Sequence, residues 1–334
     1  MTGALVDALG RGLADLRLSV IDACNFRCPY CMPADRIPHD HGTDAATRLS
    51  FDAIETLVRG FARVGTRKLR ITGGEPLLRR DLPALIARLA RIEGIDDIAL
   101  TSNGSLLARQ AQALRDAGLH RLTVSLDALD GDRFHAMSGG RGRITEVLAG
   151  IDAAVQAGFA PIKLNCVVQR GLNEDQVLPL ARFAREHGHV LRLIEYMDVG
   201  TCNAWSASDV VSAAELRERI HAHWPLHPLP ARHASDVATR HAYDDGAGEV
   251  GFIASVTAPF CGDCSRARVS ADGHLYTCLF AGYGVDLRTA IGHGEQAVAQ
   301  AVAEVWSRRV DRYSELRDAA HPQRRAIEMY VVGG

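Results

Sequence analysis

The first two hundred residues alternate short β-rich runs with longer amphipathic helical patterns. The predicted strands span residues 16–20, 68–72, 97–101, 121–125, 162–168 and 190–195. Helical patterns fall at 51–64, 82–92, 105–117, 144–157 and 174–187. Repeated strand–helix units of this kind form a parallel sheet that helices cover. The periodicity alone allows either a barrel or an open, doubly wound sheet.

The predicted strands are not apolar on both sides, although parallel strands that are buried on both faces normally are. In each strand, apolar residues alternate with a polar set that includes Arg17, Lys68, Arg70, Thr101, Lys163 and Arg192. Because successive side chains point to opposite faces, one face is predicted to meet the helices. The other would line a wet, cationic lumen for an anionic substrate. The alternative, six amphipathic edge strands, would leave the helices without a sheet to cover.

Lysine is rare in this chain, which has 38 Lys and Arg residues but only two lysines, Lys68 and Lys163. Both lie on the polar faces of predicted strands. A compact ammonium group is not interchangeable with a planar guanidinium at a crowded phosphate or carboxylate. We therefore predict that both lysines contact a substrate phosphate; the alternative is that two lysines survive by chance.

A cysteine motif follows the first predicted strand: Cys24-Asn25-Phe26-Arg27-Cys28-Pro29-Tyr30-Cys31. Three thiolates can hold three irons of a [4Fe–4S] cluster, which usually has four protein ligands. The fourth iron would be open to a substrate. Zinc is the alternative, but a structural zinc site closes with four Cys or His ligands. The nearby His39 and His41 lie in an irregular polar stretch and are poor candidates for a fourth ligand.

A second cysteine triad, Cys261, Cys264 and Cys278, lies in the last third of the chain. A zinc ribbon with His274 as the fourth ligand is possible here. Against zinc, Arg266 and Arg268 share one face of a predicted strand beside the triad, and their fork geometry suits phosphate recognition.

The strand–helix repeat ends near residue 200, so we predict two domains, at 1–200 and 201–334. Two further cysteines, Cys166 and Cys202, fall outside both triads and are predicted to be small buried residues.

Composition limits the classes of function. The formal net charge of −2 argues against bulk nucleic-acid binding. No apolar run approaches the ~18 residues of a membrane span. Residues 1–7 lack the basic and apolar regions of a secretory signal. We therefore expect a cytoplasmic protein in which the presence of eight cysteines indicates metal ligation, by the two triads, rather than disulfides.

The cysteine motif and Gly73-Gly74-Glu75-Pro76, which follows the second predicted strand, together resemble the radical S-adenosylmethionine (SAM) superfamily. The resemblance implies a partial (βα)6 TIM-type barrel with a smaller C-terminal α+β domain. It also implies a cluster on Cys24, Cys28 and Cys31 that cleaves SAM to methionine and a 5′-deoxyadenosyl radical. On the matching positions it places SAM against Tyr30, Gly74, Glu75, Ser125 and Met197.

The second triad, Arg266-x-Arg268 and the terminal Gly333-Gly334 resemble the GTP 3′,8-cyclase (MoaA) family of molybdenum cofactor biosynthesis. This implies a second [4Fe–4S] cluster on Cys261, Cys264 and Cys278 that offers its open iron to guanine. The two terminal glycines would reach into the active site. The triphosphate of GTP would be held by Arg17, Lys68, Arg70, Thr101, Lys163, Arg192, Arg266 and Arg268.

The resemblance also implies the reaction and its partners. The adenosyl radical would abstract the ribose 3′ hydrogen of GTP, and the resulting carbon radical would attack the guanine 8-position. A reducing electron donor and a downstream cyclic pyranopterin monophosphate synthase follow as partners, and the enzyme would be a monomer or homodimer.

Two rival functions remain at this stage. A radical SAM enzyme acting on a peptide would share the first half, but such enzymes usually carry more than three C-terminal cysteines. A non-catalytic iron–sulfur or zinc sensor of nucleic acid would need a basic docking face, which the charge balance does not support.

Overall fold

The computed structural model describes residues 5–32, 47–201, 203–317 and 327–333. Its strands are β1 (Asp15–Ser19), β2 (Lys68–Thr72), β3 (Asp97–Ser102), β4 (Arg121–Ser125), β5 (Lys163–Val168), β6 (Val190–Glu195), β7 (Leu226–Leu229), β8 (Thr239–Tyr243), β9 (Glu249–Ile253), β10 (Arg266–Val269), β11 (His274–Tyr276) and β12 (Val285–Asp286). Its α-helices are α1 (Phe51–Arg63), α2 (Leu82–Leu89), α3 (Ala111–Asp116), α4 (Gly131–Met137), α5 (Ile144–Gln156), α6 (Val177–Glu186), α7 (Ala213–His221), α8 (Arg288–Gly292), α9 (Glu295–Ser307) and α10 (Met329–Val332). Short 3-10 turns are η1 (Pro76–Leu78), η2 (Leu107–Arg109), η3 (Glu174–Gln176), η4 (Ala207–Asp209) and η5 (Cys261–Asp263).

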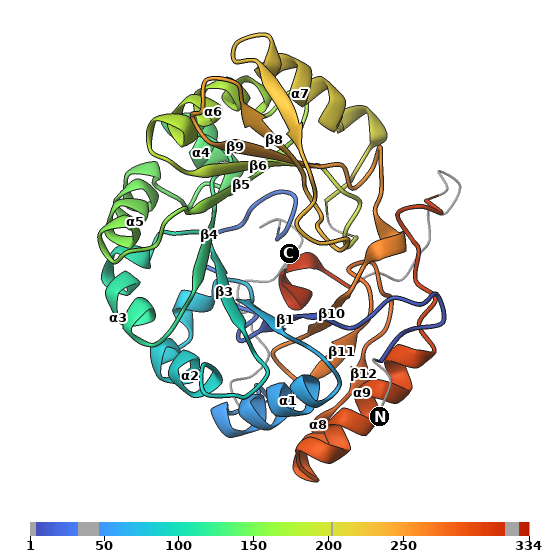
Figure 1. Cartoon of the computed structure of the whole chain (residues 1–334). Helices are drawn as coiled ribbons and strands as arrows, with labels where there is room; N and C mark the ends of the chain where they lie inside the picture. Colours follow the sequence, from blue (N-terminus) through green and yellow to red (C-terminus); the bar gives the residue numbers. More distant parts are fainter. Residues whose placement is uncertain (1–4, 33–46, 202, 318–326, 334) are drawn as a thin grey trace.

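All described strands belong to one sheet of order β12-β11-β10-β1-β2-β3-β4-β5-β6-β9-β8-β7. Strands β1 to β6 are mutually parallel, and β10 and β9 extend them in parallel at the two ends. The outer strands β11, β12, β8 and β7 pair antiparallel. Figure 1 shows the sheet curving around a centre, with helices α1 to α6 outside it. This architecture confirms the predicted partial barrel rather than the open sheet.

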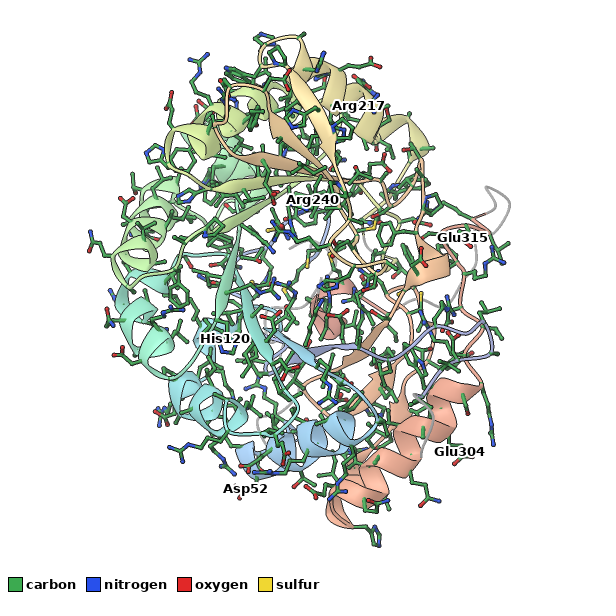
Figure 2. All side chains as sticks on the ribbon, in the orientation of Figure 1. Asp52, His120, Arg217, Arg240, Glu304 and Glu315 are labelled. Atoms are coloured by element: carbon green, nitrogen blue, oxygen red, sulfur yellow. The ribbon has the colours of Figure 1, made fainter. Side chains whose placement is uncertain are left out.

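The predicted alternation of the strands sets their two faces. The apolar side chains of Leu16, Leu18, Leu69 and Ile71 are at most 1% exposed. They pack in one continuous core with Phe61 of α1 and with the apolar faces of the other covering helices. The intervening Arg17 and Arg70 are only half-buried on the inner face. In contrast, the charged side chains labelled Asp52, Arg217 and Glu304 project from the outer rim (Figure 2).

The predicted boundary at residue 200 falls just after β6, and the sheet continues across it. Strands from the second part extend both ends of the barrel, since β10 pairs with β1 and β9 pairs with β6. Register pairs Arg17 with both Arg70 and Arg268. The second part of the chain therefore completes the wall of the barrel and brings its own arginines to it.

The strands and helices lie close to their predicted positions. Strands β2, β4 and β6 match the predicted ranges, β3 and β5 differ by one residue at one end, and β1 is shifted by one residue toward the N-terminus. The pattern predicted at 105–117 is the least accurate, because it contains the turn η2 before the short helix α3. The two predicted helices at 144–157 and 174–187 are present as α5 and as η3 followed by α6.

Candidate active site

The loops at the carboxyl ends of the parallel strands carry the predicted site, as is usual in barrels of this type. The first cysteine triad follows β1, and Cys31 N–H and Met32 N–H both donate to the Cys28 carbonyl, at 2.9 and 2.8 Å. Arg27 closes the other side of the turn, because its Nη1 donates to the Cys24 carbonyl at 2.6 Å. The loop is therefore held by its own backbone and by one buried arginine.

The loop after β2 packs directly against the cysteine loop. Gly74 N–H donates to the Ile21 carbonyl at 2.8 Å. A Cβ at Gly74 would lie 2.3 Å from the Ala23 carbonyl oxygen, so only glycine fits. Glu75 N–H donates to the same Ala23 carbonyl at 2.9 Å. The two motifs that the sequence analysis singled out thus form one unit next to Cys24.

The carboxylate of Glu75 is fully buried and organises the end of β3. It accepts hydrogen bonds from Ser102 Oγ at 2.8 Å, Asn103 N–H at 2.7 Å and Leu77 N–H at 3.0 Å. Burial raises the pKa of Glu75 to about 7, against the lowering effect of these donors. An ammonium group placed beside Glu75 would favour its ionised form, which suits the predicted contact with the amino group of SAM.

Tyr30 is fixed by Asp127, for which the sequence predicted no role. Its hydroxyl donates to Asp127 Oδ2 at 2.8 Å, and the other carboxylate oxygen accepts from Val167 N–H at 2.9 Å. Both side chains are buried, Tyr30 at 9% and Asp127 at 6% exposure. The ring beside Cys31 is thereby tied to the carboxyl end of β4. The position of Asp127, directly after a predicted strand, was the available signal.

The inner wall of the barrel is cationic, as the strand faces predict. Arg17, Arg70 and Arg268 lie in register on three neighbouring strands. Arg70 Nη1 donates to Thr101 Oγ1 at 3.1 Å and to Thr123 Oγ1 at 3.2 Å. Thr101 therefore orients Arg70.

These cations depress one another's pKa values. Burial and then the neighbouring arginines Arg268, Arg70 and Arg266 lower the pKa of Arg17 well below its ordinary value. Burial with Arg192 and other cations lowers the pKa of Lys163 to about 7. The pKa values of Arg70, Arg192 and Arg268 each fall to about 10, chiefly through burial. A wall of mutually repelling buried cations favours a multiply charged anion.

The second cysteine triad borders the same interior. Cys261 and Cys264 flank the turn η5, and Cys278 follows β11. Cys28, Cys31 and Cys278 all pack against one apolar cluster that contains Tyr30, Met137, Tyr196, Val199, Phe280 and Met329. Met197 packs against this cluster as well. The two triads therefore face a shared region from opposite parts of the chain.

The end of the chain enters the barrel. Helix α10 lies in the middle of the ring of strands (Figure 1) and packs against β1. Arg268 Nη1 donates to the Val332 carbonyl at 3.1 Å and also to the Gly333 carbonyl. Gly333 has a φ of +68°, and a Cβ there would lie 2.1 Å from Thr72 Cγ2. Gly334, predicted to act with it, lies outside the described residues.

The thiols of the two triads are of the kind that ligates iron–sulfur clusters. The six cysteines of the triads are free thiols and are half-buried. Backbone N–H groups of Phe26 and Phe280 point at the sulfurs of Cys24 and Cys278, both at 3.4 Å. Such N–H contacts are among the interactions that tune iron–sulfur clusters. Among the described residues, no three Cys, His, Asp or Glu side chains are grouped so that they could hold a single metal ion.

Other predicted residues have simpler positions. Ser125 is half-buried at the end of β4, and Lys68 and Arg192 are half-buried on the inner-face positions of β2 and β6. Arg266 Nη2 contacts Cys264 Sγ at 3.5 Å. Cys166 is fully buried, which confirms that prediction, whereas Cys202 lies outside the described residues. His274, the candidate zinc ligand, instead faces Asp272, with its Nδ1 3.1 Å from Oδ2.

Sequence reasoning missed several residues of the site. Asn103 Nδ2 approaches Cys24 Sγ at 3.9 Å and donates to Asn25 Oδ1 at 2.8 Å, so it links the end of β3 to the cysteine loop. Asp127 holds Tyr30. Arg11 and Arg309 contact the second triad and Asp7 joins these two arginines, and no local sequence signal identifies the three residues.

The fold and the cysteine loop after β1 define a radical SAM enzyme, and residues 18–184 match the model of the Radical SAM superfamily. Residues 189–315 match the model described as Molybdenum Cofactor Synthesis C. The chain belongs to the GTP 3′,8-cyclase family. A relative of that name from Xanthomonas campestris pv. campestris (strain 8004) is 64% identical over 328 residues, covering 98% of this chain and 97% of the relative.

More distant proteins agree with this placement. The GTP 3′,8-cyclase of Acidothermus cellulolyticus is 50% identical over 362 residues and covers 100% of both chains. Among solved structures, Streptococcus suis SuiB bound to S-adenosylmethionine matches with a TM-score of 0.64 at 14% identity, covering 92% of this chain and 69% of that one. This last likeness concerns the fold alone. As a member of its superfamily, the chain uses SAM and an iron–sulfur cluster.

Proposed function

We propose that this chain converts GTP into (8S)-3′,8-cyclo-7,8-dihydroguanosine 5′-triphosphate, the first step of molybdopterin biosynthesis. The observation that carries the proposal is the cationic inner wall, in which Arg17, Arg70 and Arg268 lie in register on three neighbouring strands. Such a wall requires a polyanion, and the relatives are named for a reaction of GTP, which is one. The peptide and nucleic-acid alternatives leave this wall without a purpose.

The cofactors supply the radical chemistry, and the chain supplies orientation. Cys24, Cys28 and Cys31 would hold the first cluster, which when bound would supply the electron for the cleavage of SAM to methionine and the hydrogen-abstracting 5′-deoxyadenosyl radical. Tyr30, which Asp127 anchors, would flank the adenine of SAM. Gly74 and Glu75 would hold its amino group, with Glu75 accepting a hydrogen bond from it. Ser125 and Met197 would contact the carboxylate or ribose and the adenine, respectively.

The chain would hold GTP at both of its ends. The triphosphate would lie against the cations Arg17, Lys68, Arg70, Lys163, Arg192, Arg266 and Arg268, with Thr101 keeping Arg70 in place. The guanine would meet a second [4Fe–4S] cluster on Cys261, Cys264 and Cys278. Fixing both ends presents the ribose 3′ carbon to the cleaved SAM, and such positioning accounts for much of the catalytic effect of many enzymes.

The proposal includes partners and a location. A reducing electron donor must supply the electron for SAM cleavage. It must also supply a second electron, which together with a proton reduces the cyclised nucleotide radical to the product. A cyclic pyranopterin monophosphate synthase would take the product. Within the described residues, no helix is both long enough and apolar enough to cross a bilayer. We place the enzyme in the cytoplasm, as a monomer or homodimer, in agreement with its metal-ligating use of cysteine.

The test is anaerobic incubation of the reconstituted, reduced protein with SAM and GTP. Mass and proton spectra of the nucleotide are recorded, and 5′-deoxyadenosine is quantified. We expect a cyclised isomer of GTP in step with 5′-deoxyadenosine, and loss of GTP binding when Arg266 and Arg268 are both changed to Ala. Formation of 5′-deoxyadenosine while GTP stays intact would refute the assignment of the substrate.

A further inference from the structure

We propose that Asp7, Arg11 and Arg309 form a buried clasp that positions the second cysteine triad. The N-terminal hairpin, which the antiparallel bridge between Val6 and Gly12 closes, is then part of the second cluster site. This inference rests on the second cluster of the proposed function. Asp7 and Arg11 precede both segments that match family models, at 18–184 and 189–315. Neither the family models nor the cysteine motifs point to them.

The turn that carries two of the three cysteines has little support of its own. Cys261 and Cys264 flank a single 3-10 turn, closed by a bond from Cys264 N–H to the Cys261 carbonyl at 3.3 Å. The residues between them, Gly262 and Asp263, are exposed. A cluster requires its thiolates at fixed positions, so the turn needs to be held from outside.

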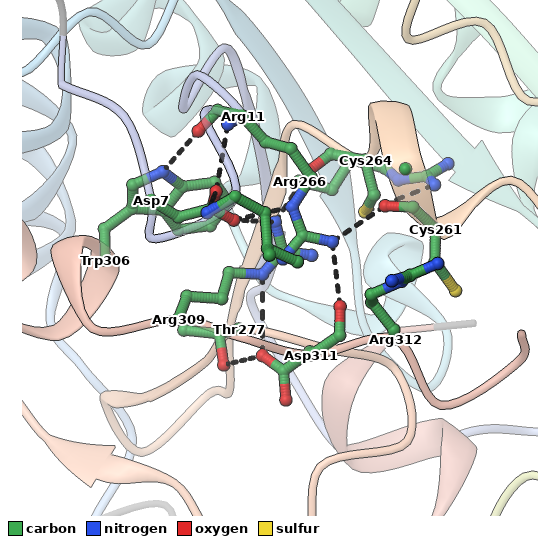
Figure 3. Close-up of polar contacts among 12 residues, drawn as sticks. Asp7, Arg11, Cys261, Cys264, Arg266, Thr277, Trp306, Arg309, Asp311 and Arg312 are labelled. Atoms are coloured by element: carbon green, nitrogen blue, oxygen red, sulfur yellow. Dashed lines mark hydrogen bonds and ion pairs between the residues drawn. The ribbon is translucent and has the colours of Figure 1, made fainter. Parts of the chain in front are cut away.

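Two arginines hold it by its carbonyl oxygens (Figure 3). Arg11 Nη1 donates to the Cys261 carbonyl at 2.7 Å, and Arg309 Nη1 donates to the Cys264 carbonyl at 2.7 Å. These are charge-assisted bonds, roughly twice as strong as neutral ones. Each end of the turn is therefore fixed by a different arginine.

One carboxylate oxygen joins the two arginines. Asp7 Oδ2 lies 2.6 Å from Arg11 Nε and 3.2 Å from Arg309 Nη1. Asp7, Arg11 and Arg309 are 5%, 5% and 4% exposed, so the pairings are shielded from water and from salt. Asp7 Oδ1 also accepts from Arg11 N–H at 2.9 Å, which closes the hairpin that presents Arg11.

The same network reaches the third cysteine. Arg11 Nη1 donates to the Asp311 carbonyl at 2.8 Å, and Arg309 Nε lies 3.5 Å from Asp311 Oδ2. That carboxylate oxygen accepts from Thr277 Oγ1 at 2.6 Å, and Thr277 directly precedes Cys278. The clasp thus contacts all three cysteine positions through the backbone or a neighbouring residue.

Trp306 completes the clasp from the end of α9. Its Nε1 donates to the Arg11 carbonyl at 3.0 Å, and the Arg309 guanidinium lies over its ring at 4.5 Å. Trp306 is 1% exposed. The geometry of both arginines is therefore set by packing as well as by charge, which is what a positioning role requires.

The test uses two backgrounds that each retain one cluster. Changing Cys24, Cys28 and Cys31 to Ala leaves only the second triad, and changing Cys261, Cys264 and Cys278 to Ala leaves only the first. Arg309→Lys is introduced into both, because lysine keeps the charge but has a single nitrogen, which cannot reproduce the Nη1 bonds to Asp7 and the Cys264 carbonyl together with the Nε contact to Asp311. After anaerobic reconstitution, the release of iron to a chelator and the electron paramagnetic resonance spectrum of the reduced cluster are recorded.

In the protein that retains only the second triad, we expect iron release to accelerate about tenfold, the lower end of the usual effect of residues that orient metal ligands. The resonance spectrum of that cluster should change as well. In the protein that retains only the first triad, both readouts should stay unchanged. Arg11→Lys, which acts on the other end of the turn, should give the same selective result. Arg308→Lys is the matched control, since the neighbouring Arg308 is exposed and pairs only with Glu304 in the ion pairs described.

Equal acceleration in both backgrounds would show a general loss of structure and overturn the inference. If Arg309→Lys left the rate of iron release unchanged in the protein with the second triad alone, the clasp would be refuted, whereas the second cluster itself would stand. If that parent protein binds no iron even with Arg309 intact, the second cluster of the proposed function fails and the clasp fails with it.

Discussion

We predict that GTP binding depends on pH through Lys163, which we have proposed as a contact of the triphosphate. Its pKa is lowered to about 7 by burial and then by Arg192, Arg121 and Arg70. A bound triphosphate adds negative charge beside the ammonium and returns its pKa toward the ordinary value of 10.5. GTP therefore binds best when Lys163 is protonated, and binding takes up a proton above neutral pH.

The size of the pH effect on GTP affinity follows from the pKa of Lys163 in the GTP-free protein. At pH 8, about a tenth of Lys163 is protonated in the free protein, given its pKa of about 7. The dissociation constant for GTP is lowest where Lys163 is fully protonated. At pH 8 it should be about tenfold above that value, and at pH 9 about tenfold higher again. Each pH unit costs about 1.4 kcal/mol of binding free energy in this range.

Isothermal titration calorimetry of the anaerobically reconstituted protein measures both quantities. Titrations between pH 7.5 and 9 avoid the ionisation of the terminal phosphate itself, which lies near pH 6. Buffers of different ionisation enthalpy report the proton uptake, expected at about 0.9 proton per GTP at pH 8. The Lys163→Arg variant keeps the cation without a titration in this range, so its affinity should be nearly flat with pH.

Two results would refute this reasoning. A wild-type affinity that does not change between pH 7.5 and 9 would mean that Lys163 does not meet the triphosphate. If the GTP affinity of the Lys163→Arg variant fell with pH as steeply as that of the wild type, the titrating group would be another residue. Lys68→Met is the comparison variant, because it should weaken binding and leave the slope intact.

Two further predictions concern SAM and the tail. Tyr30→Phe removes the 2.8 Å hydrogen bond to Asp127 and leaves one oxygen of this buried carboxylate without its donor. The free energy of unfolding, measured by thermal or denaturant unfolding, should therefore fall by about 1–3 kcal/mol. SAM binding should weaken as well, and unchanged values in both assays would contradict the anchoring role of Asp127. Deleting Gly333 and Gly334 should abolish cyclisation while both clusters still bind, as iron analysis would report. Full activity of the truncated protein would contradict a role for the tail.

Several parts of the fold and site could be predicted from local sequence. A strand's two faces follow from alternation alone, which is why Arg17, Arg70 and Lys163 were predicted on a polar inner face. The cysteine motif and Gly73–Glu75 were recognisable because each is a continuous stretch whose residues act together. Their placement at the carboxyl ends of β1 and β2 follows from the general behaviour of parallel sheets.

Other features depend on residues that meet only after folding. Tyr30 finds Asp127 across 97 positions, and Arg11 reaches the Cys261 carbonyl across 250. The pKa of Lys163 depends on arginines from neighbouring strands, so no reading of its own strand could supply it. Hydrogen bonds and charge interactions act over a few ångströms in space, whatever the separation in sequence.

The sequence by itself thus determined the parallel sheet of strand–helix units, its cationic face and the six cysteines of the two triads, because periodicity and spacing encode them; closure into a barrel was an expectation from the family resemblance, which the strand pairing confirms. Only the tertiary structure decided how those cysteines are held. The pairing of β10 with β1 brings Arg268 beside Arg17, and it places the second triad near the N-terminal hairpin. That juxtaposition depends on strand order, which local patterns do not specify.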